Sequence, residues 1–221
     1  MLILIGDTRS LANVEVLRTR RWGRMYVRTG PKPYPYEPWG FDCRAFKAWQ
    51  DAGFPVGLTQ NDWSVLWDSV DFENWLEVCR TVPMPPKIAV VPDIPGSAES
   101  LQWSLRWRSR LPNDWPWYLS VQDGMSVGHV LSVAHLFDGI FLGGTDRFKL
   151  TAQVWCDLAH FCGKKFHYAR AGTRSKLQHA YAIGADSLDS SYPLWTKRRF
   201  WQFGQWVDGL GLQRTFDYAE V

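Results

Sequence analysis

The feature that most constrains the fold is the alternation of short apolar runs with helical patterns along the chain. Eight runs have the length and composition of strands, and several are apolar at every position, as strands buried on both faces of a sheet are. The expected strands are Leu2–Ile5, Met25–Arg28, Trp39–Asp42, Ile88–Val91, Trp117–Val121, Ile140–Leu142, Phe166–Ala169 and Ala185–Leu188.

Helical patterns fill most of the later gaps between these runs. The expected helices are Ala98–Arg110, Val127–Leu136, Thr151–Phe161 and Arg174–Ile183. This alternation predicts an α/β protein, a compact (β/α)8 TIM barrel that forms a single domain over residues 1–221. A doubly wound open sheet is the alternative. The proline-rich segment Gly30–Pro38 predicts a loop after the second strand.

The composition is that of an ordinary globular protein with one exception. The chain is 46% hydrophobic and 21% charged, its net charge is +3, and it has no apolar stretch near the roughly 20 residues of a membrane span. The exception is its 14 tryptophans. We expect most of them in the core and expect exposed ones to offer stacking surfaces for nucleobases.

The four cysteines and five histidines show no spacing typical of a zinc site. We therefore expect no structural metal, no cofactor, and reduced thiols in a cytoplasmic protein. The histidines are expected on helix faces or in core contacts.

Polar or glycine residues follow nearly every expected strand. They are Asp7, Asp42, Asp93, Gln122 with Asp123, the pair Gly143–Gly144, Arg170, and Asp189. A single Asp after a strand is usually a helix cap. Because the carboxyl ends of parallel strands meet at one end of a barrel, however, we expect these groups to converge where barrel enzymes carry their active sites.

The segment from His167 to Ser190 is the most informative part of this pattern. An apolar run ends at a small-residue turn, a helical stretch follows, and a second run ends in carboxylates. This βαβ unit is expected to carry both Asp186 and Asp189 to the carboxyl end of the sheet. There a carboxylate can serve as a nucleophile, a base or a metal ligand.

Four segments occur in the order seen in tRNA-guanine transglycosylases, and the chain resembles that family. They are Val90–Ile94, Ser120–Gly124, Phe141–Thr145 and Gly184–Asp189. The chain resembles more closely the DNA-acting relatives of that family, the DpdA (deoxypurine-in-DNA) proteins, because it lacks the zinc-binding Cys/His region of the tRNA enzymes. The resemblance extends from about Gly6 to Trp195.

The resemblance implies two catalytic carboxylates. Asp189 corresponds to the nucleophile that attacks C1′ of the nucleotide and holds the sugar covalently. Asp42 corresponds to the general acid/base. Such a pair fits a reaction that passes through an oxocarbenium-like state, and different environments would separate the two pKa values.

The resemblance also implies a base-binding set. Asp93 and Gln122 correspond to residues that hydrogen-bond the guanine edge. The backbone of Gly143 and Gly144 corresponds to the part that reads the guanine carbonyl, and the pair Ala171–Gly172 to a small-residue floor beneath the base.

Basic residues near these positions are expected to contact nucleic acid. Arg44, with Cys43, replaces the small pair that follows the acid/base in the family, and this cation either alters base choice or holds a phosphate. The cluster Lys197, Arg198 and Arg199 corresponds to a basic segment of the tRNA enzymes, which implies contacts to phosphates.

The expected function is exchange of guanine in DNA for a 7-deazaguanine base through a covalent Asp–sugar intermediate. The target base must leave the helical stack to be reached. Three alternatives remain open: a hydrolytic DNA glycosylase on the same scaffold, a non-catalytic DNA-binding barrel, and a barrel enzyme for a small phosphorylated metabolite.

Overall fold

The computed structural model describes residues 1–8, 10–27, 32–34 and 37–210. Eight parallel strands close into a barrel in sequence order, with the last strand paired to the first. They are β1 (Leu2–Gly6), β2 (Gly23–Tyr26), β3 (Trp39–Phe41), β4 (Ile88–Val90), β5 (Trp117–Val121), β6 (Gly139–Leu142), β7 (Lys165–Tyr168) and β8 (Ser187–Ser190). The (β/α)8 barrel prediction is confirmed, and the open-sheet alternative is wrong because the ring closes.

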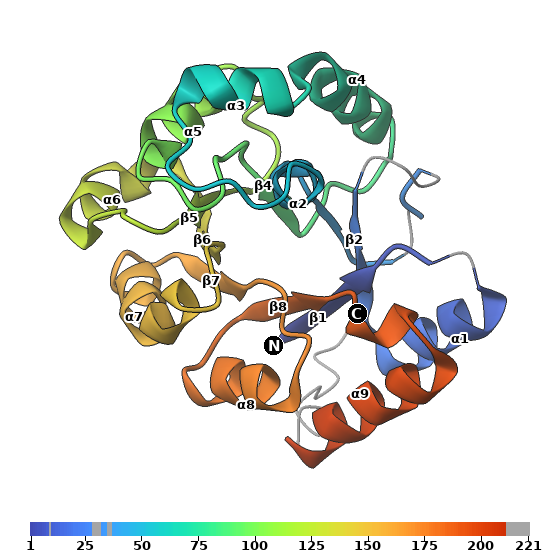
Figure 1. Cartoon of the computed structure of the whole chain (residues 1–221). Coiled ribbons are helices and arrows are strands. Elements are labelled where there is room, and N and C mark those ends of the chain that lie inside the picture. Colours follow the sequence, from blue (N-terminus) through green and yellow to red (C-terminus); the bar gives the residue numbers. More distant parts are fainter. Residues whose placement is uncertain (9, 28–31, 35–36, 211–221) are drawn as a thin grey trace.

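Helices surround this barrel (Figure 1). They are α1 (Leu11–Arg20), α2 (Ala45–Asp51), α3 (Gln60–Leu66), α4 (Ser69–Arg80), α5 (Ser100–Arg108), α6 (Val127–Val133), α7 (Ala152–Phe161), α8 (Arg174–Ala182) and α9 (Lys197–Gly209), with the 3-10 turns η1 (Ala134–Leu136), η2 (Phe148–Thr151) and η3 (Tyr192–Leu194). The four predicted helices are present with small boundary shifts. Among the described residues, no helix has the length and apolar character of a bilayer span.

Helices α1 to α4 were not predicted, for reasons that differ between them. Only Leu17 of α1 and only Trp63 of α3 are buried, so neither helix presents a clear apolar period. Helix α4 does present one, since Phe72, Leu76 and Cys79 are buried at helical spacing, and this was the signal available in the sequence. Part of the predicted loop Gly30–Pro38, and Arg28 of the predicted second strand, lie outside the described residues.

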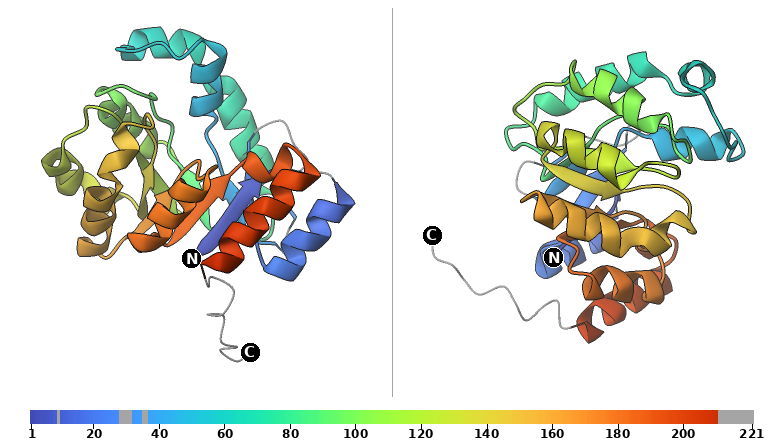
Figure 2. Two further views of the ribbon diagram at one scale, coloured as in Figure 1. Left: turned by 60° about the horizontal axis from the view of Figure 1, so that its bottom comes forward. Right: turned by 90° about the vertical axis from the view of Figure 1, so that its left-hand side faces the viewer.

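Three consecutive helices between β3 and β4 give the barrel an uneven outline. Figure 2 shows α2 and α3 beyond the end of the barrel, on one side of its opening. In a (β/α)8 barrel the segments after each strand lie at the carboxyl end, so these helices belong to the face that carries the strand-end residues. The insertion therefore builds one wall of that face.

Most tryptophans lie in the layer between strands and helices, as predicted. Trp39 and Phe41 of β3 meet Trp115 edge to face, with ring centroids 5.5 and 5.2 Å apart. Such contacts add to the stability gained from burying the rings. Trp195 and Trp201, by contrast, are 63% and 73% exposed.

Candidate functional site

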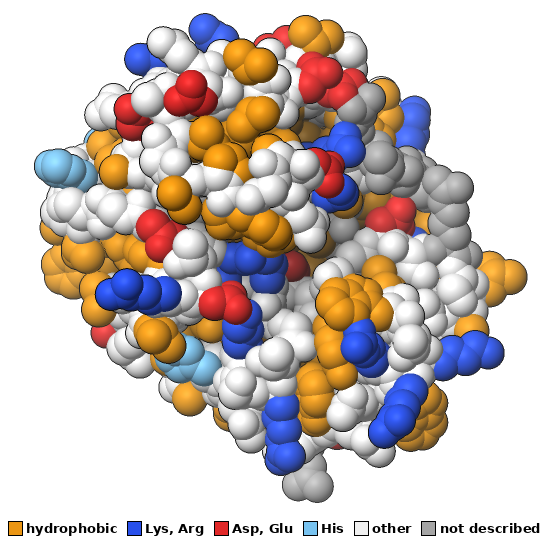
Figure 3. All heavy atoms as spheres, in the orientation of Figure 1, with side chains coloured by type: hydrophobic (Ala, Val, Ile, Leu, Met, Phe, Trp, Pro, Cys, Tyr) orange, Lys and Arg blue, Asp and Glu red, His pale blue; other side chains and the backbone are white. Residues whose placement is uncertain are grey.

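A cavity of about 200 Å³ lies at the carboxyl end of the barrel. Its lining includes six of the predicted site residues, which come from the ends of five strands: Asp42, Asp93, Gln122, Gly143, Gly144 and Asp189. The space-filling view of the molecule shows a hollow near the centre of one face, with Lys and Arg side chains around it (Figure 3). The expected convergence of these residues is therefore observed.

Asp189 lies within β8 and is held from two sides. Its Oδ1 is 2.9 Å from Nε2 of His167 and accepts the backbone N–H of Arg170 at 3.1 Å. His167 is fully buried, its Nδ1 is 2.9 Å from Oγ of Ser187, and its ring stacks on Phe141 at 4.6 Å. These contacts fix the orientation of the Asp189 carboxylate.

The proton arrangement on His167 follows from its neighbours. Burial lowers the pKa of His167, although the hydrogen bond and charge of Asp189 oppose the shift. The imidazole is therefore neutral at pH 7. Its Nε2–H donates to the carboxylate, which only accepts, and its Nδ1 accepts the Ser187 hydroxyl.

Asp42 follows β3 and has the properties of an acid/base group. Burial raises its pKa to about 7, and the charges of Asp189 and Asp93 add to the rise. The backbone N–H of Arg44, 2.6 Å from Oδ1, and the Arg44 charge oppose it. A carboxyl group with this pKa exchanges a proton easily near neutral pH.

Asp93 and Gln122 bind each other in this structure. The Nε2 group of Gln122 donates to Asp93 and to Oγ of Ser120, and Asp93 also accepts from Sγ of Cys43 at 3.3 Å. Burial raises the pKa of Asp93. The groups expected to read a base edge are thus paired with one another, and an incoming base must replace some of these bonds.

The Gly143–Gly144 turn is built around Gln122. A Cβ at position 143 would overlap the Gln122 amide, and Gly144 has a φ of +68°, which favours glycine. The N–H of Gly143 donates to the carbonyl of Val121, and the N–H of Gly144 donates to Oε1 of Gln122 at 2.7 Å. Reading of a base carbonyl by Gly144 therefore requires Gln122 to move.

Ala171 and Gly172 do not line this cavity, so the small-residue floor is displaced from the predicted position. Ala169 and Arg170, the residues just before them, line it instead. The N–H of Ala171 donates to the backbone carbonyl of Asp189 at 2.7 Å, which turns Ala171 away into the protein. Its role is to fix the end of β8.

Arg170 forms one wall of the cavity. Its backbone has a φ of +56°, its guanidinium donates to the carbonyl of Gly144, and it stacks over Phe46 at 4.1 Å. Non-glycine residues in this conformation are uncommon and cluster at functional sites. The side chain places a positive charge near Asp189.

The prediction for Asp186 was wrong. Strand β8 begins at Ser187, so Asp186 lies at the amino end of the barrel, opposite the cavity. There its carboxylate accepts the N–H of Phe166 at 2.8 Å and contacts Nε2 of His160 at 3.0 Å. It closes the bottom of the barrel and has no part in the site.

The basic cluster at the start of α9 divides into two parts. Lys197 and Arg198 are exposed. Arg199 is packed between aromatic rings, 5.1 Å from the ring centre of Tyr192 and 4.5 Å from that of Trp195. Arg199 therefore supports the exposed Trp195, and the other two cations are the ones open to a ligand.

His167 is the site residue that sequence reasoning missed. It was expected in a core contact, and it is buried, but one of its nitrogens contacts the predicted nucleophile. The sequence of β7 does not alternate between apolar and polar residues, so it does not show whether the His167 side chain points into the barrel. The contact with Asp189 becomes visible only when β7 is paired with β8.

In the described part of the chain, no three His, Cys, Asp or Glu side chains are grouped as metal ligands would be. Comparisons with protein-family models and with characterised proteins find no match to this chain.

Proposed function

We propose that this protein is a transglycosylase that replaces a guanine of DNA with a 7-deazaguanine base. The observation that carries the proposal is that Asp42, with a pKa raised to about 7, and Asp189, oriented by His167 and Arg170, face the same cavity. An acid and a nucleophile on either side of a glycosidic carbon are what this reaction needs.

The first half-reaction uses both carboxylates. The carboxylate oxygen of Asp189 that does not accept from His167 attacks C1′, and the bond between C1′ and N9 of guanine breaks. Asp42 supplies the proton that the departing base takes up. The product is a sugar ester of Asp189 and a free guanine.

The second half-reaction reverses these roles. A 7-deazaguanine enters the cavity, gives its N9 proton to Asp42, and attacks C1′ as the ester bond to Asp189 breaks. Two displacements at C1′ retain its configuration. A cavity of about 200 Å³ suits a single extruded nucleobase, which Asp93 and Gln122 would hold by its polar edge.

The test follows the fate of the base. Purified protein is incubated with DNA carrying labelled guanine and with candidate 7-deazaguanines, and the nucleosides are analysed by mass. We expect label release with incorporation of the second base. Release without incorporation would assign a hydrolytic glycosylase instead.

The intermediate gives an independent test. DNA should form an adduct with the protein that survives denaturation and is cleaved by hydroxylamine, as an aspartyl ester is. Asp189→Asn should lose the adduct. Asp186→Asn, at the opposite end of the barrel, is the matched control and should keep it. An adduct that persists in Asp189→Asn would contradict the assignment of the nucleophile.

A further inference from the structure

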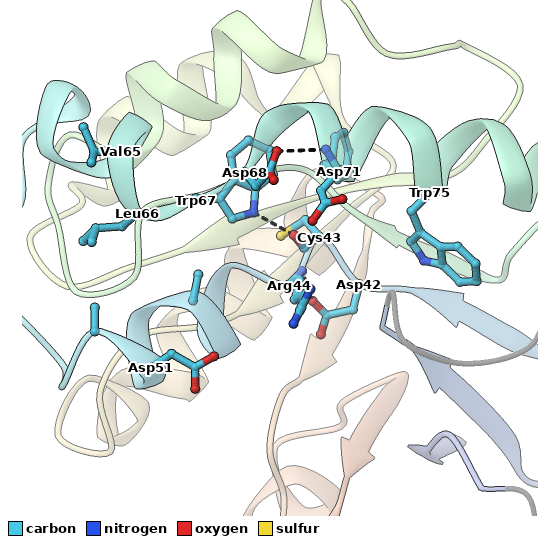
Figure 4. Close-up of a pocket in the computed structure, with 13 residues that line it drawn as sticks. Asp42, Cys43, Arg44, Asp51, Val65, Leu66, Trp67, Asp68, Asp71 and Trp75 are labelled. Atoms are coloured by element: carbon cyan, nitrogen blue, oxygen red, sulfur yellow. Dashed lines mark hydrogen bonds between the residues drawn. The ribbon is translucent and has the colours of Figure 1, made fainter.

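A second cavity, of about 380 Å³, adjoins the first one. The two cavities share Asp42 and Cys43, so these residues form a common wall. The second cavity lies between α2 and the segment that joins α3 to α4, and Figure 4 shows the side chains that line it. The proposed transglycosylase reaction uses none of this space.

Trp75 supplies a buried, unsatisfied donor in this cavity. The side chain is 8% exposed, and its Nε1 has no hydrogen-bond partner among the residues that the structure describes. In Figure 4 the nitrogen-bearing edge of the indole faces the side of the cavity where Asp42 and Arg44 lie. A buried N–H without an acceptor destabilises the folded protein, and a ligand oxygen or ring nitrogen would remove that cost.

Aromatic and aliphatic side chains line much of the second cavity, and they can pack against a flat ligand. Trp67 is held in place because its Nε1 donates to the carbonyl of Cys43 at 2.9 Å, and Phe72 packs against it at 5.3 Å. Val65 and Leu66 stand at the exposed side, Val65 being 85% exposed. A planar group is the natural occupant of such a space.

Arg44 lies beside the wall between the two cavities. Its backbone has a φ of +65°, and its backbone N–H donates to Oδ1 of Asp42 at 2.6 Å. Within the described part of the chain, its guanidinium has neither a hydrogen bond nor an ion pair. A half-buried cation in this position can bind a phosphate that links groups in the two cavities.

Three carboxylates complete the lining and limit what else can enter. Asp51 is paired with Lys47, Asp68 caps α4 by accepting the N–H of Asp71 at 3.0 Å, and Asp71 lies beside it. These groups repel a phosphate placed deep in the cavity. The carboxylates of Asp51 and Asp68 have further acceptor lone pairs for amino groups, however, so a ligand with both an N–H₂ group and an acceptor suits them together with Trp75.

We infer that this second cavity binds the nucleobase next to the target guanine in the DNA strand, and that it favours bases with an exocyclic amino group. Arg44 then contacts the phosphate between the two nucleotides. The inference rests on the proposed function, because it places the target guanine in the first cavity. It gives the enzyme a preference for the neighbouring base, which the first cavity does not provide.

Binding to short single strands tests this directly. Each nine-residue oligonucleotide carries one guanine, one natural neighbour on its 5′ or 3′ side, and abasic sugars elsewhere. The full chain carrying Asp189→Asn is used so that the strand is not consumed, and affinity is measured by fluorescence anisotropy. We expect adenine or cytosine, on one side of the guanine, to bind about fivefold more tightly than thymine or an abasic sugar.

Paired variants identify the cavity. Trp75→Phe removes the N–H and should lower the affinity for adenine and cytosine neighbours toward that for an abasic sugar. Trp103→Phe should not, since its Nε1 is also buried and has no partner among the described residues, but lies outside the cavity. Val65→Trp fills the exposed side without disturbing the core and should act like Trp75→Phe. Val70→Trp, at an exposed position of α4 outside the cavity lining, is its control.

The outcomes separate the inference from the proposed function. Three results would overturn the inference. They are equal affinity for all neighbours on both sides, no binding of any strand, and a preference that survives both Trp75→Phe and Val65→Trp. Base exchange by the wild-type protein is measured separately. Exchange without a neighbour effect removes only the second-cavity assignment, and a neighbour effect without exchange or release removes only the transglycosylase.

Discussion

The Nε2 atom of His167 lies 2.9 Å from Oδ1 of Asp189, and no part of the His167 side chain is exposed. The contact engages one carboxylate oxygen of Asp189 and leaves the other without a contact to the imidazole. The two residues come from neighbouring strands of the barrel, and in the proposed reaction Asp189 is the nucleophile and His167 its positioning residue.

Replacing His167 should slow the reaction without removing the nucleophile. His167→Phe keeps the ring stacked on Phe141 but loses the donor, and we expect kcat/KM to fall about 10- to 100-fold, as for a lost hydrogen bond to a charged group. His167→Gln should restore part of the rate. An unchanged kcat/KM in a folded His167→Phe variant, or no recovery of the rate in His167→Gln, would mean that the histidine is purely structural.

The raised pKa of Asp42 predicts how base release depends on pH. Release needs the protonated carboxyl group, so its rate should fall about tenfold per pH unit well above pH 7. Single-turnover release of labelled guanine between pH 5 and 9 measures this. Asp42→Asn should lower the rate and flatten the profile, and a profile in the variant that still falls above pH 7 would assign the acid role to another group.

The same group should affect the stability of the fold in a defined direction. The folded-state pKa of about 7 lies above the ordinary value of 3.8, so the folded protein binds more protons between these values. The free energy of unfolding should therefore decrease as pH rises from about 4 to 7, by on the order of 2–4 kcal/mol from Asp42. Urea unfolding across this range should show a smaller decrease in Asp42→Asn. Asp93, whose pKa is also raised, accounts for a remaining decrease in the same direction.

Asp93→Asn should weaken selection of the base more than the chemical step. The carboxylate accepts from two donors, whereas an amide offers one acceptor and one donor, so the preference for guanine over adenine should fall by about 1–3 kcal/mol. Competition between the two free bases for the covalent intermediate measures this. An unchanged preference would show that Asp93 does not face the base.

Two exposed cations at the start of α9 should supply phosphate contacts. Lys197→Ala with Arg198→Ala should weaken DNA binding for all sequences and reduce the salt dependence of log K by about one to two units. Arg199→Ala should instead affect the environment of Trp195, seen in its fluorescence, because Arg199 lies against that ring. A salt slope that changes only in Arg199→Ala would reverse these roles.

Local patterns in the sequence were enough to predict the barrel and much of its mouth. Strand-length apolar runs and helical periods are local properties, and the order of elements leaves few topologies open. Asp42, Asp93, Gln122 and Asp189 could be placed at one end because each follows or ends a strand. A parallel barrel brings those ends together.

The finer predictions were wrong where a strand boundary or a cavity-lining position differed by one or two residues from the expected one. Strand β8 begins two residues later than its apolar pattern, which sends Asp186 to the opposite end of the barrel. Ala171 is drawn away by its bond to the backbone of Asp189, and Arg170 takes the place beside the cavity. These outcomes depend on hydrogen bonds between strands, which a single segment does not contain.

Local periodicity and chain direction, which are properties of the sequence, are enough to predict which strands form, their order, and the position of Asp42, Asp93 and Asp189 at or near the carboxyl ends of their strands. The contact between His167 and Asp189, the raised pKa of Asp42 and the second cavity formed by the helices after β3 could not be predicted in this way. They depend on inward orientation, desolvation and cavity shape, which arise when segments far apart in the chain pack together.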